Sequence, residues 1–107
     1  MNTLKWNKEY ALEQTADDAE LLEELLEIFK DSFQSDLQLI KEGLAESSAA
    51  KISAAAHSIK GAAASLGILG INEIALQVEE DSRRGGLDVA REKFEELQSL
   101  LAELRAL

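Results

Sequence analysis

Residues 19–45 read AELLEELLEIFKDSFQSDLQLIKEGLA, and this long run of helix-forming residues decides the fold. Its apolar residues recur at spacings of three and four, which is the pattern of one face of an α-helix. The predicted core stripe consists of Leu22, Leu25, Phe29, Phe33, Leu37, Ile40 and Leu44, widened by Leu21, Ile28 and Leu39. A helix of this length cannot bury such a stripe by itself, so it needs neighbouring helices along its length.

Breaks on either side of this run delimit further helices. Thr15–Asp18 is a cap-like cluster before it, and Ser48 is a predicted N-cap after it. Gly67 suits the left-handed residue that follows a helix, and Gly85–Gly86 is the strongest breaker in the chain. The other predicted helices are Asn7–Gln14, packed down by Trp6 and Tyr10, then Ala49–Leu66, Gly70 or Ile71 to Ser82, and Leu87–Leu104. Amphipathic helices joined by short loops predict an all-α fold, an antiparallel four-helix bundle with a short extra N-terminal helix.

The composition supports this fold class and argues against several functions. The chain has 107 residues, which suits a single domain spanning residues 1–107. Proline is absent and aromatic residues make up only 5%, which disfavours a sheet. The absence of cysteine removes disulfides and thiolate chemistry, and a net charge of -10 disfavours nucleic-acid binding. We find neither a signal peptide nor a run of roughly 20 apolar residues, so we expect a cytoplasmic protein that does not bind a membrane.

The segment 51–66, KISAAAHSIKGAAASL, holds the only histidine of the chain. On a helical wheel its core-facing residues are Ile52, Ala55, Ala56, Ile59, Ala63 and Leu66. His57 points about 140° away from Ile52 and so faces solvent. The residues around it are Ser53, Ala54, Lys60, Gly61 and Ala64. All but Lys60 are small, and Gly61 costs about 1 kcal/mol relative to alanine inside a helix. The pattern predicts a bare patch where a partner can approach the imidazole.

Few kinds of chemistry suit one exposed imidazole. A metal site is disfavoured because no second histidine or cysteine is present. A catalytic triad is not evident, since the sequence has no nucleophile elbow. Nucleophilic attack on phosphorus remains, with Lys60 able to offset charge on the transferred group. The sequence has no nucleotide-binding motif, so a partner must supply the phosphoryl group. The residues alone leave a second interpretation open, in which His57 is an ordinary surface residue.

The stretch His57-Ser58-Ile59-Lys60-Gly61-Ala62-Ala63-Ala64-Ser65-Leu66-Gly67 resembles the signature of histidine-phosphotransfer (HPt) domains of two-component phosphorelays. The resemblance extends over nearly the whole chain. The run Leu21–Phe29 looks like the first long helix of the family. Val78-Glu79, followed by Arg84-Gly85, looks like the family's next helix and its exit turn.

This resemblance implies an antiparallel four-helix bundle that is a monomer and has the phosphorylated histidine on the second bundle helix. It implies that His57 accepts a phosphoryl group from a receiver-domain aspartate and passes it reversibly to another receiver. The expected partners are response-regulator receiver domains and a hybrid histidine kinase, and Mg²⁺ is expected on the receiver. Lys60 matches the lysine beside the phosphoryl group, and Gly61, with Ala54 and Ala64 in support, leaves room for the partner. Glu79 matches a position that can hold the imidazole, although a glutamate there could simply be solvated.

Other functions remain open from the sequence. A chemotaxis-type histidine kinase has a phosphoacceptor module with a similar motif, and that module is labelled by a kinase domain and ATP. A non-enzymatic helical interaction bundle would leave His57 incidental. A carboxylate-bridged metal bundle needs histidines that face the core, and His57 faces outward. The apolar residues of the long helix suggest a partner-docking patch, with Leu39 as one candidate.

Overall fold

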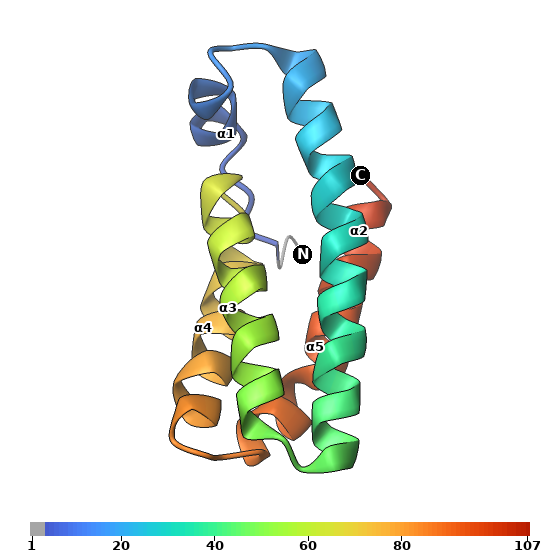
Figure 1. Cartoon of the computed structure of the whole chain (residues 1–107). Coiled ribbons are helices and arrows are strands. Elements are labelled where there is room, and N and C mark those ends of the chain that lie inside the picture. Colours follow the sequence, from blue (N-terminus) through green and yellow to red (C-terminus); the bar gives the residue numbers. More distant parts are fainter. Residues whose placement is uncertain (1–3) are drawn as a thin grey trace.

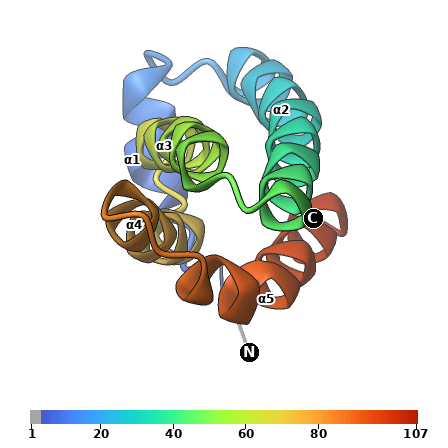
Figure 2. The ribbon, with the colours of Figure 1, turned by 60° about the horizontal axis from the view of Figure 1, so that its bottom comes forward.

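The computed structural model describes residues 4–107 and shows a bundle of helices without a β-strand in that part of the chain (Figure 1). The helices are α1 (Lys8–Gln14), α2 (Ala19–Glu46), α3 (Ala49–Ser65), α4 (Leu69–Arg83) and α5 (Asp88–Arg105). The four longer helices run alternately up and down, and each packs against two others in the ring order α2, α3, α4, α5 (Figures 1 and 2). The predicted bundle and its short N-terminal helix are therefore confirmed, with ends within a few residues of those expected.

The helix ends form where the sequence provides capping groups. The side chain of Asp18 accepts a hydrogen bond from the Leu21 amide at the start of α2, and Ser48 accepts one from the Lys51 amide at the start of α3. These bonds satisfy amide groups that have no partner inside the helix. Gly67 follows α3 with a φ of 71°, a left-handed conformation that glycine adopts without steric cost.

The core runs along the inside of the bundle. Its largest fully buried apolar side chains are Phe33, Ile40, Ile52, Ile59, Ile68, Ile71, Leu97, Leu104 and Val78. The predicted stripe of α2 was too wide: Leu25, expected in the core, is 36% exposed, and Leu26 is buried in its place. Leu21, Ile28 and Leu39 are also exposed, Ile28 at 63%. The reason is geometric, because α3 and α5 cover only one side of α2 and leave the edge of the stripe outside.

The segment before α1 holds the upper end of the bundle together. The indole N–H of Trp6 donates to the Leu66 carbonyl over 3.0 Å, and the Asn7 amide donates to the Gly67 carbonyl over 2.8 Å. The Gly70 amide in turn donates to the Leu4 carbonyl over 2.8 Å. These bonds fasten the N-terminal segment across the turn between α3 and α4. Trp6 packs against the core as predicted, whereas Tyr10, which was predicted to pack beside it, is 39% exposed.

Two helical glycines provide a matched test of this packing. A Cβ at Gly43 of α2 would lie 2.6 Å from Cγ1 of the buried Ile52, whereas a Cβ at Gly61 of α3 meets nothing within 4 Å. Gly43→Ala is expected to lower the free energy of unfolding by about 1–2 kcal/mol because the crowding outweighs the gain in helix propensity. Gly61→Ala is expected to raise it by about 0.5–1 kcal/mol. Urea unfolding measures both changes in stability. Equal effects of the two substitutions would contradict the close contact between Gly43 of α2 and Ile52 of α3.

Candidate functional site

Helix α3 divides into a buried face and an open face, as the sequence predicted. All six residues predicted to face the core are buried: Ile52, Ala55, Ala56, Ile59, Ala63 and Leu66. His57 lies on the opposite face, with 62% of its side chain exposed. The buried face anchors the helix against α2 and α4. The imidazole is therefore presented to solvent from a rigid element.

The imidazole is held from one side by Glu79 of α4. Oε2 of Glu79 lies 2.6 Å from Nδ1 of His57, and Oε1 lies 2.5 Å from Nζ of Lys60. An Arg83 guanidinium nitrogen lies 3.2 Å from Oε2 as well. The Glu79 side chain is only 2% exposed. Glu79 is therefore buried and not solvated, which settles the point that the sequence left open. Its three neighbours supply the partners that a buried charge requires.

The protonation of this cluster follows from its surroundings. Burial alone would raise the pKa of Glu79, but hydrogen bonds from Lys60 and His57, with the charges of Lys60 and Arg83, outweigh it and hold the pKa below its ordinary value of 4.5. An ionised carboxylate can only accept hydrogen bonds, so the proton in the bond to His57 belongs to Nδ1. In the neutral ring this leaves Nε2, on the far side of the imidazole, with a free lone pair.

The charge of Glu79 makes a testable contribution to stability. Glu79→Gln keeps the shape and an acceptor oxygen but removes the charge, and at neutral pH we expect it to lower the free energy of unfolding by about 1–2 kcal/mol. Because the folded pKa of Glu79 is depressed, its stabilisation is present above the ordinary pKa of 4.5 and is lost as pH falls through the folded value. The gap between parent and variant should therefore shrink below pH 4.5 in urea unfolding. A gap that stays constant in acid would contradict the ionised cluster.

Lys60 is placed differently from the expectation. The helical wheel predicted that Lys60 lies on the outer face beside the imidazole. In the structure its side chain is 26% exposed and turns toward α4, where it pairs with Glu79. The carbonyl of Lys60 also accepts a hydrogen bond from the Asn72 side chain of α4, over 3.1 Å. The ammonium group therefore lies against the same carboxylate as His57, within the cluster. Its role toward a phosphoryl group remains a prediction.

The side chains around His57 are short and leave the imidazole accessible, as the small residues predicted. Gly61 is exposed, with open space where a side chain would project. Ala54 and Ala64 are exposed alanines on the same face. A shallow depression lies beside the imidazole between α3 and the end of α4, and Arg83 lines it. Nothing in these surroundings blocks the approach of a large partner to the ring.

Two residues near the imidazole escaped the sequence analysis. Arg83 was not singled out in the sequence analysis, although its spacing of four from Glu79 is one at which helical side chains meet. Asp36 of α2 shares a hydrogen bond with Ser58, the residue after His57. Burial raises the pKa of Asp36, and the bond to Ser58 offsets only part of that effect. No sequence signal marked Asp36, because the pairing depends on how α2 and α3 pack.

The arrangement is suited to accepting a group at one nitrogen. It has an exposed imidazole whose Nδ1 is engaged by a buried carboxylate, and two cations that also contact the carboxylate. Among residues 4–107, no three His, Cys, Asp or Glu side chains come together as a metal-binding group. Over the same residues, no helix has the length and apolar character needed to cross a membrane. The chemistry that fits the cluster is nucleophilic attack by Nε2.

Comparisons with known proteins agree with this chemistry. The family model described as "Hpt domain" matches residues 24–107. The HPT domain from the Hpt sensor hybrid histidine kinase from Shewanella has a similar structure, with a TM-score of 0.79 and 18% sequence identity. The match covers 98% of this chain and 94% of that one, which establishes a shared helical-bundle fold. No curated protein matches the chain. Because the family model covers most of the sequence, the chain belongs to the Hpt-domain family, and its role is histidine phosphotransfer in a phosphorelay.

Proposed function

We propose that His57 is the residue that carries the phosphoryl group, taking it from the aspartate of one receiver domain and passing it to another. One observation carries the assignment: the only histidine of the chain is exposed, while its Nδ1 is held by the buried Glu79. Hpt domains act together with response-regulator receiver domains and histidine kinases. For this chain, the proposed partners are receiver domains and a hybrid histidine kinase.

The transfer needs little chemistry from this chain. The lone pair of Nε2 attacks the phosphorus of the aspartyl phosphate, the bond from phosphorus to the aspartate oxygen breaks, and the carboxylate leaves with the electron pair. The attacking ring starts neutral and becomes a phosphorylated imidazolium, so no proton has to depart during the step. The ionised Glu79 stabilises this positive ring through Nδ1–H. The reverse transfer uses the same contacts, which agrees with a reversible relay.

The remaining groups orient the reactants and balance charge. Lys60 sits one helical turn from His57, where its charge favours a phosphoryl group that approaches the ring. The rigid α3 helix holds the imidazole in line with the incoming aspartyl phosphate, and positioning accounts for much of catalysis in phosphoryl transfer. We expect Mg²⁺ on the receiver domain, where it would assist the aspartate.

An exposed apolar stripe on α2 is the surface that we assign to receiver docking. This α2 stripe consists of Leu21, Leu25, Ile28 and Leu39. These residues lie within about 40° of one line on the helical wheel. Asp36, about 60° from that line, contacts Ser58 of α3, whereas Gln34, on the opposite side, accepts a hydrogen bond from Arg105 of α5. The stripe therefore borders α3 and continues into the small residues around His57.

Docking through this stripe predicts a selective loss of transfer. Ile28→Asp should slow phosphoryl transfer from a receiver about tenfold or more, because a charge replaces the most exposed apolar side chain of the stripe. Labelling of His57 by a small phosphoramidate donor should stay unchanged, since that donor needs no docking. The matched control is Gln38→Asp, an exposed residue of α2 that lies outside the stripe. Equal slowing by both variants would reject this docking surface.

The function itself is tested by mixing the chain with receiver domains that a small-molecule donor has phosphorylated in the presence of Mg²⁺. Intact-mass spectrometry at neutral to alkaline pH should show one phosphoryl group on the chain, and acid should remove it, as expected for a nitrogen–phosphorus bond. Labelling only by a histidine kinase with ATP, without a receiver, would favour the chemotaxis-type module instead. No labelling by either source would contradict the proposal and favour a helical interaction bundle.

A further inference from the structure

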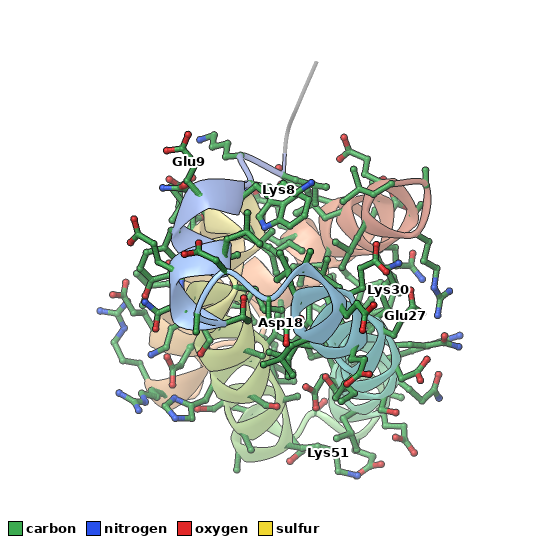
Figure 3. The ribbon with its side chains drawn as sticks, turned by 90° about the horizontal axis from the view of Figure 1, so that it is seen from above. Lys8, Glu9, Asp18, Glu27, Lys30 and Lys51 are labelled. Carbon is green, nitrogen blue, oxygen red and sulfur yellow. The ribbon has the colours of Figure 1, made fainter. Side chains whose placement is uncertain are left out.

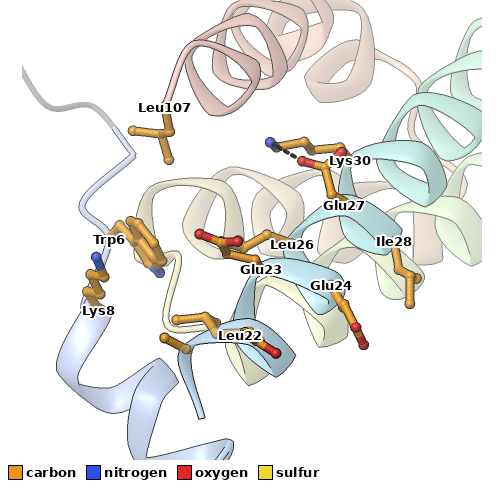
Figure 4. A pocket seen from close by; sticks show the side chains of 12 residues that line it. Trp6, Lys8, Leu22, Glu23, Glu24, Leu26, Glu27, Ile28, Lys30 and Leu107 are labelled. Carbon is orange, nitrogen blue, oxygen red and sulfur yellow. Dashed lines mark hydrogen bonds and ion pairs between the residues drawn. The ribbon is translucent and has the colours of Figure 1, made fainter. Parts of the chain in front are cut away.

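The α2 stripe is interrupted halfway along the helix. Figure 4 shows Ile28, an end of the interruption, pointing away from the core residue Leu22. Between Ile28 and Leu39, the exposed residues within about 40° of the line of the stripe are Ser32 and Ser35. Both are small and uncharged. Apolar side chains and small hydroxyl groups suit many partners, so they give this surface little means of choosing among receivers.

One charged residue borders the interruption. Asp36 lies about 60° from the line of the stripe, on the side toward α3, and it is partly buried. The hydroxyl group of Ser58, the residue after His57 in α3, donates a hydrogen bond to the Asp36 carboxylate. Asp36 therefore stands between the stripe and the imidazole, in the region that the proposed docking covers.

The basic side chains nearby have other partners. Lys30, in the same part of α2, points away from α3 and pairs with Glu27 (Figure 3). Lys60 of α3 pairs with Glu79 on the α4 side. None of the ion pairs that the structure shows among residues 4–107 includes Asp36. The charge of this carboxylate is therefore left for a partner to neutralise.

Docking makes this charge decisive. Burial raises the pKa of Asp36, because the carboxylate has lost part of its contact with water. A receiver that covers Asp36 removes more water, and a carboxylate that is then left without a cation weakens the complex. A basic side chain opposite Asp36 instead forms a charge-assisted hydrogen bond with it. The same carboxylate therefore favours one receiver and penalises another.

We propose that Asp36 is a specificity-determining residue, which selects receiver domains that carry a lysine or arginine on the surface that docks against α2. This inference rests on the proposed work of the chain with receivers, and it adds the chemistry by which a receiver is chosen. The apolar stripe supplies affinity for receivers in general, and Asp36 discriminates between them.

The test measures binding of an unphosphorylated receiver domain by isothermal titration calorimetry. The probe is the receiver of a panel that binds the parent chain most tightly, and each of its exposed lysines and arginines is replaced by glutamate in turn. Asp36→Lys should weaken binding of the parent receiver about tenfold or more. One glutamate variant of the receiver should bind Asp36→Lys within about threefold of the original affinity, because the charge pair is restored in reverse.

Three further variants separate a charge contact from general attraction and from a structural role. Asp31→Lys makes the same charge change at an exposed position of α2, about 80° from the stripe on the side away from α3, and should weaken binding less than about threefold. Ser58→Ala breaks the contact of Asp36 with α3 but keeps the charge, so its effect should be equally small. Asp36→Asn keeps an acceptor for Ser58, and it should bind the parent receiver and the restoring glutamate variant with equal affinity.

Two results would overturn the selection by Asp36. One is equal weakening by Asp36→Lys and Asp31→Lys, and the other is the lack of any receiver variant that restores binding. Either result, together with labelling of the parent chain by phosphorylated receivers, would leave the role of His57 in place. Restored binding without any labelling of His57 would support Asp36 and contradict the carrier role, because the titration uses no phosphoryl donor.

Discussion

Replacing His57 with glutamine is expected to abolish phosphoryl acceptance while leaving the bundle intact. Glutamine has no nucleophilic ring nitrogen, and the chain contains no second histidine that could take over. Loss of a nucleophile typically lowers a rate by a factor of about a thousand or more, so no phosphoryl group should appear on the time scale of the parent. Intact-mass spectrometry after mixing with a phosphorylated receiver measures the loss.

The fold should survive this substitution because the His57 side chain is 62% exposed and glutamine can still donate to Glu79. We expect the free energy of unfolding to change by less than about 0.5 kcal/mol. Ser58→Ala is the matched control, since it removes a neighbouring hydroxyl and should leave acceptance in place. An acid-labile phosphoryl group on the His57→Gln variant would identify another residue as the carrier.

The sequence was sufficient for the bundle because the signals for its helices are local. Capping groups at Asp18 and Ser48, and the turn at Gly67, lie within a few residues of the ends that they set. Local signals did not determine which residues of the apolar stripe on α2 are buried. Whether Leu25 or Leu26 is buried depends on the angle at which α3 and α5 pack on α2, and both residues fit the helical period.

The same distinction explains what was found at the site. The outward direction of His57 and the open space at Gly61 follow from the wheel of one helix, and the structure confirms both. The burial of Glu79 and the turn of Lys60 toward it depend on how α3 meets α4. The sequence could place a carboxylate near the imidazole only through family resemblance. It could not show that the same carboxylate also contacts Arg83.

The bare surface at Gly61 leads to the second large effect. Gly61→Gln is expected to slow transfer from a receiver about a hundredfold, because a long side chain one turn from His57 occupies the space through which the receiver reaches the imidazole. The variant itself meets no neighbour within 4 Å at Cβ, so it should fold at least as stably as the parent, with a gain of about 0.5 kcal/mol from helix propensity.

Stability and transfer should therefore move in opposite directions, which no unfolding artefact can imitate. Gly61→Ala is the matched control: it gives a similar gain in helix propensity but adds only a methyl group, so transfer should slow about threefold or less. Labelling by a small phosphoramidate donor should be nearly equal in the parent and both variants, because that donor does not require the receiver's surface. If Gly61→Gln transferred as fast as Gly61→Ala, the receiver would have to approach His57 from another side. The stripe on α2 would then lose its connection to the site, since Gly61 lies on the outer face of α3 that the stripe borders.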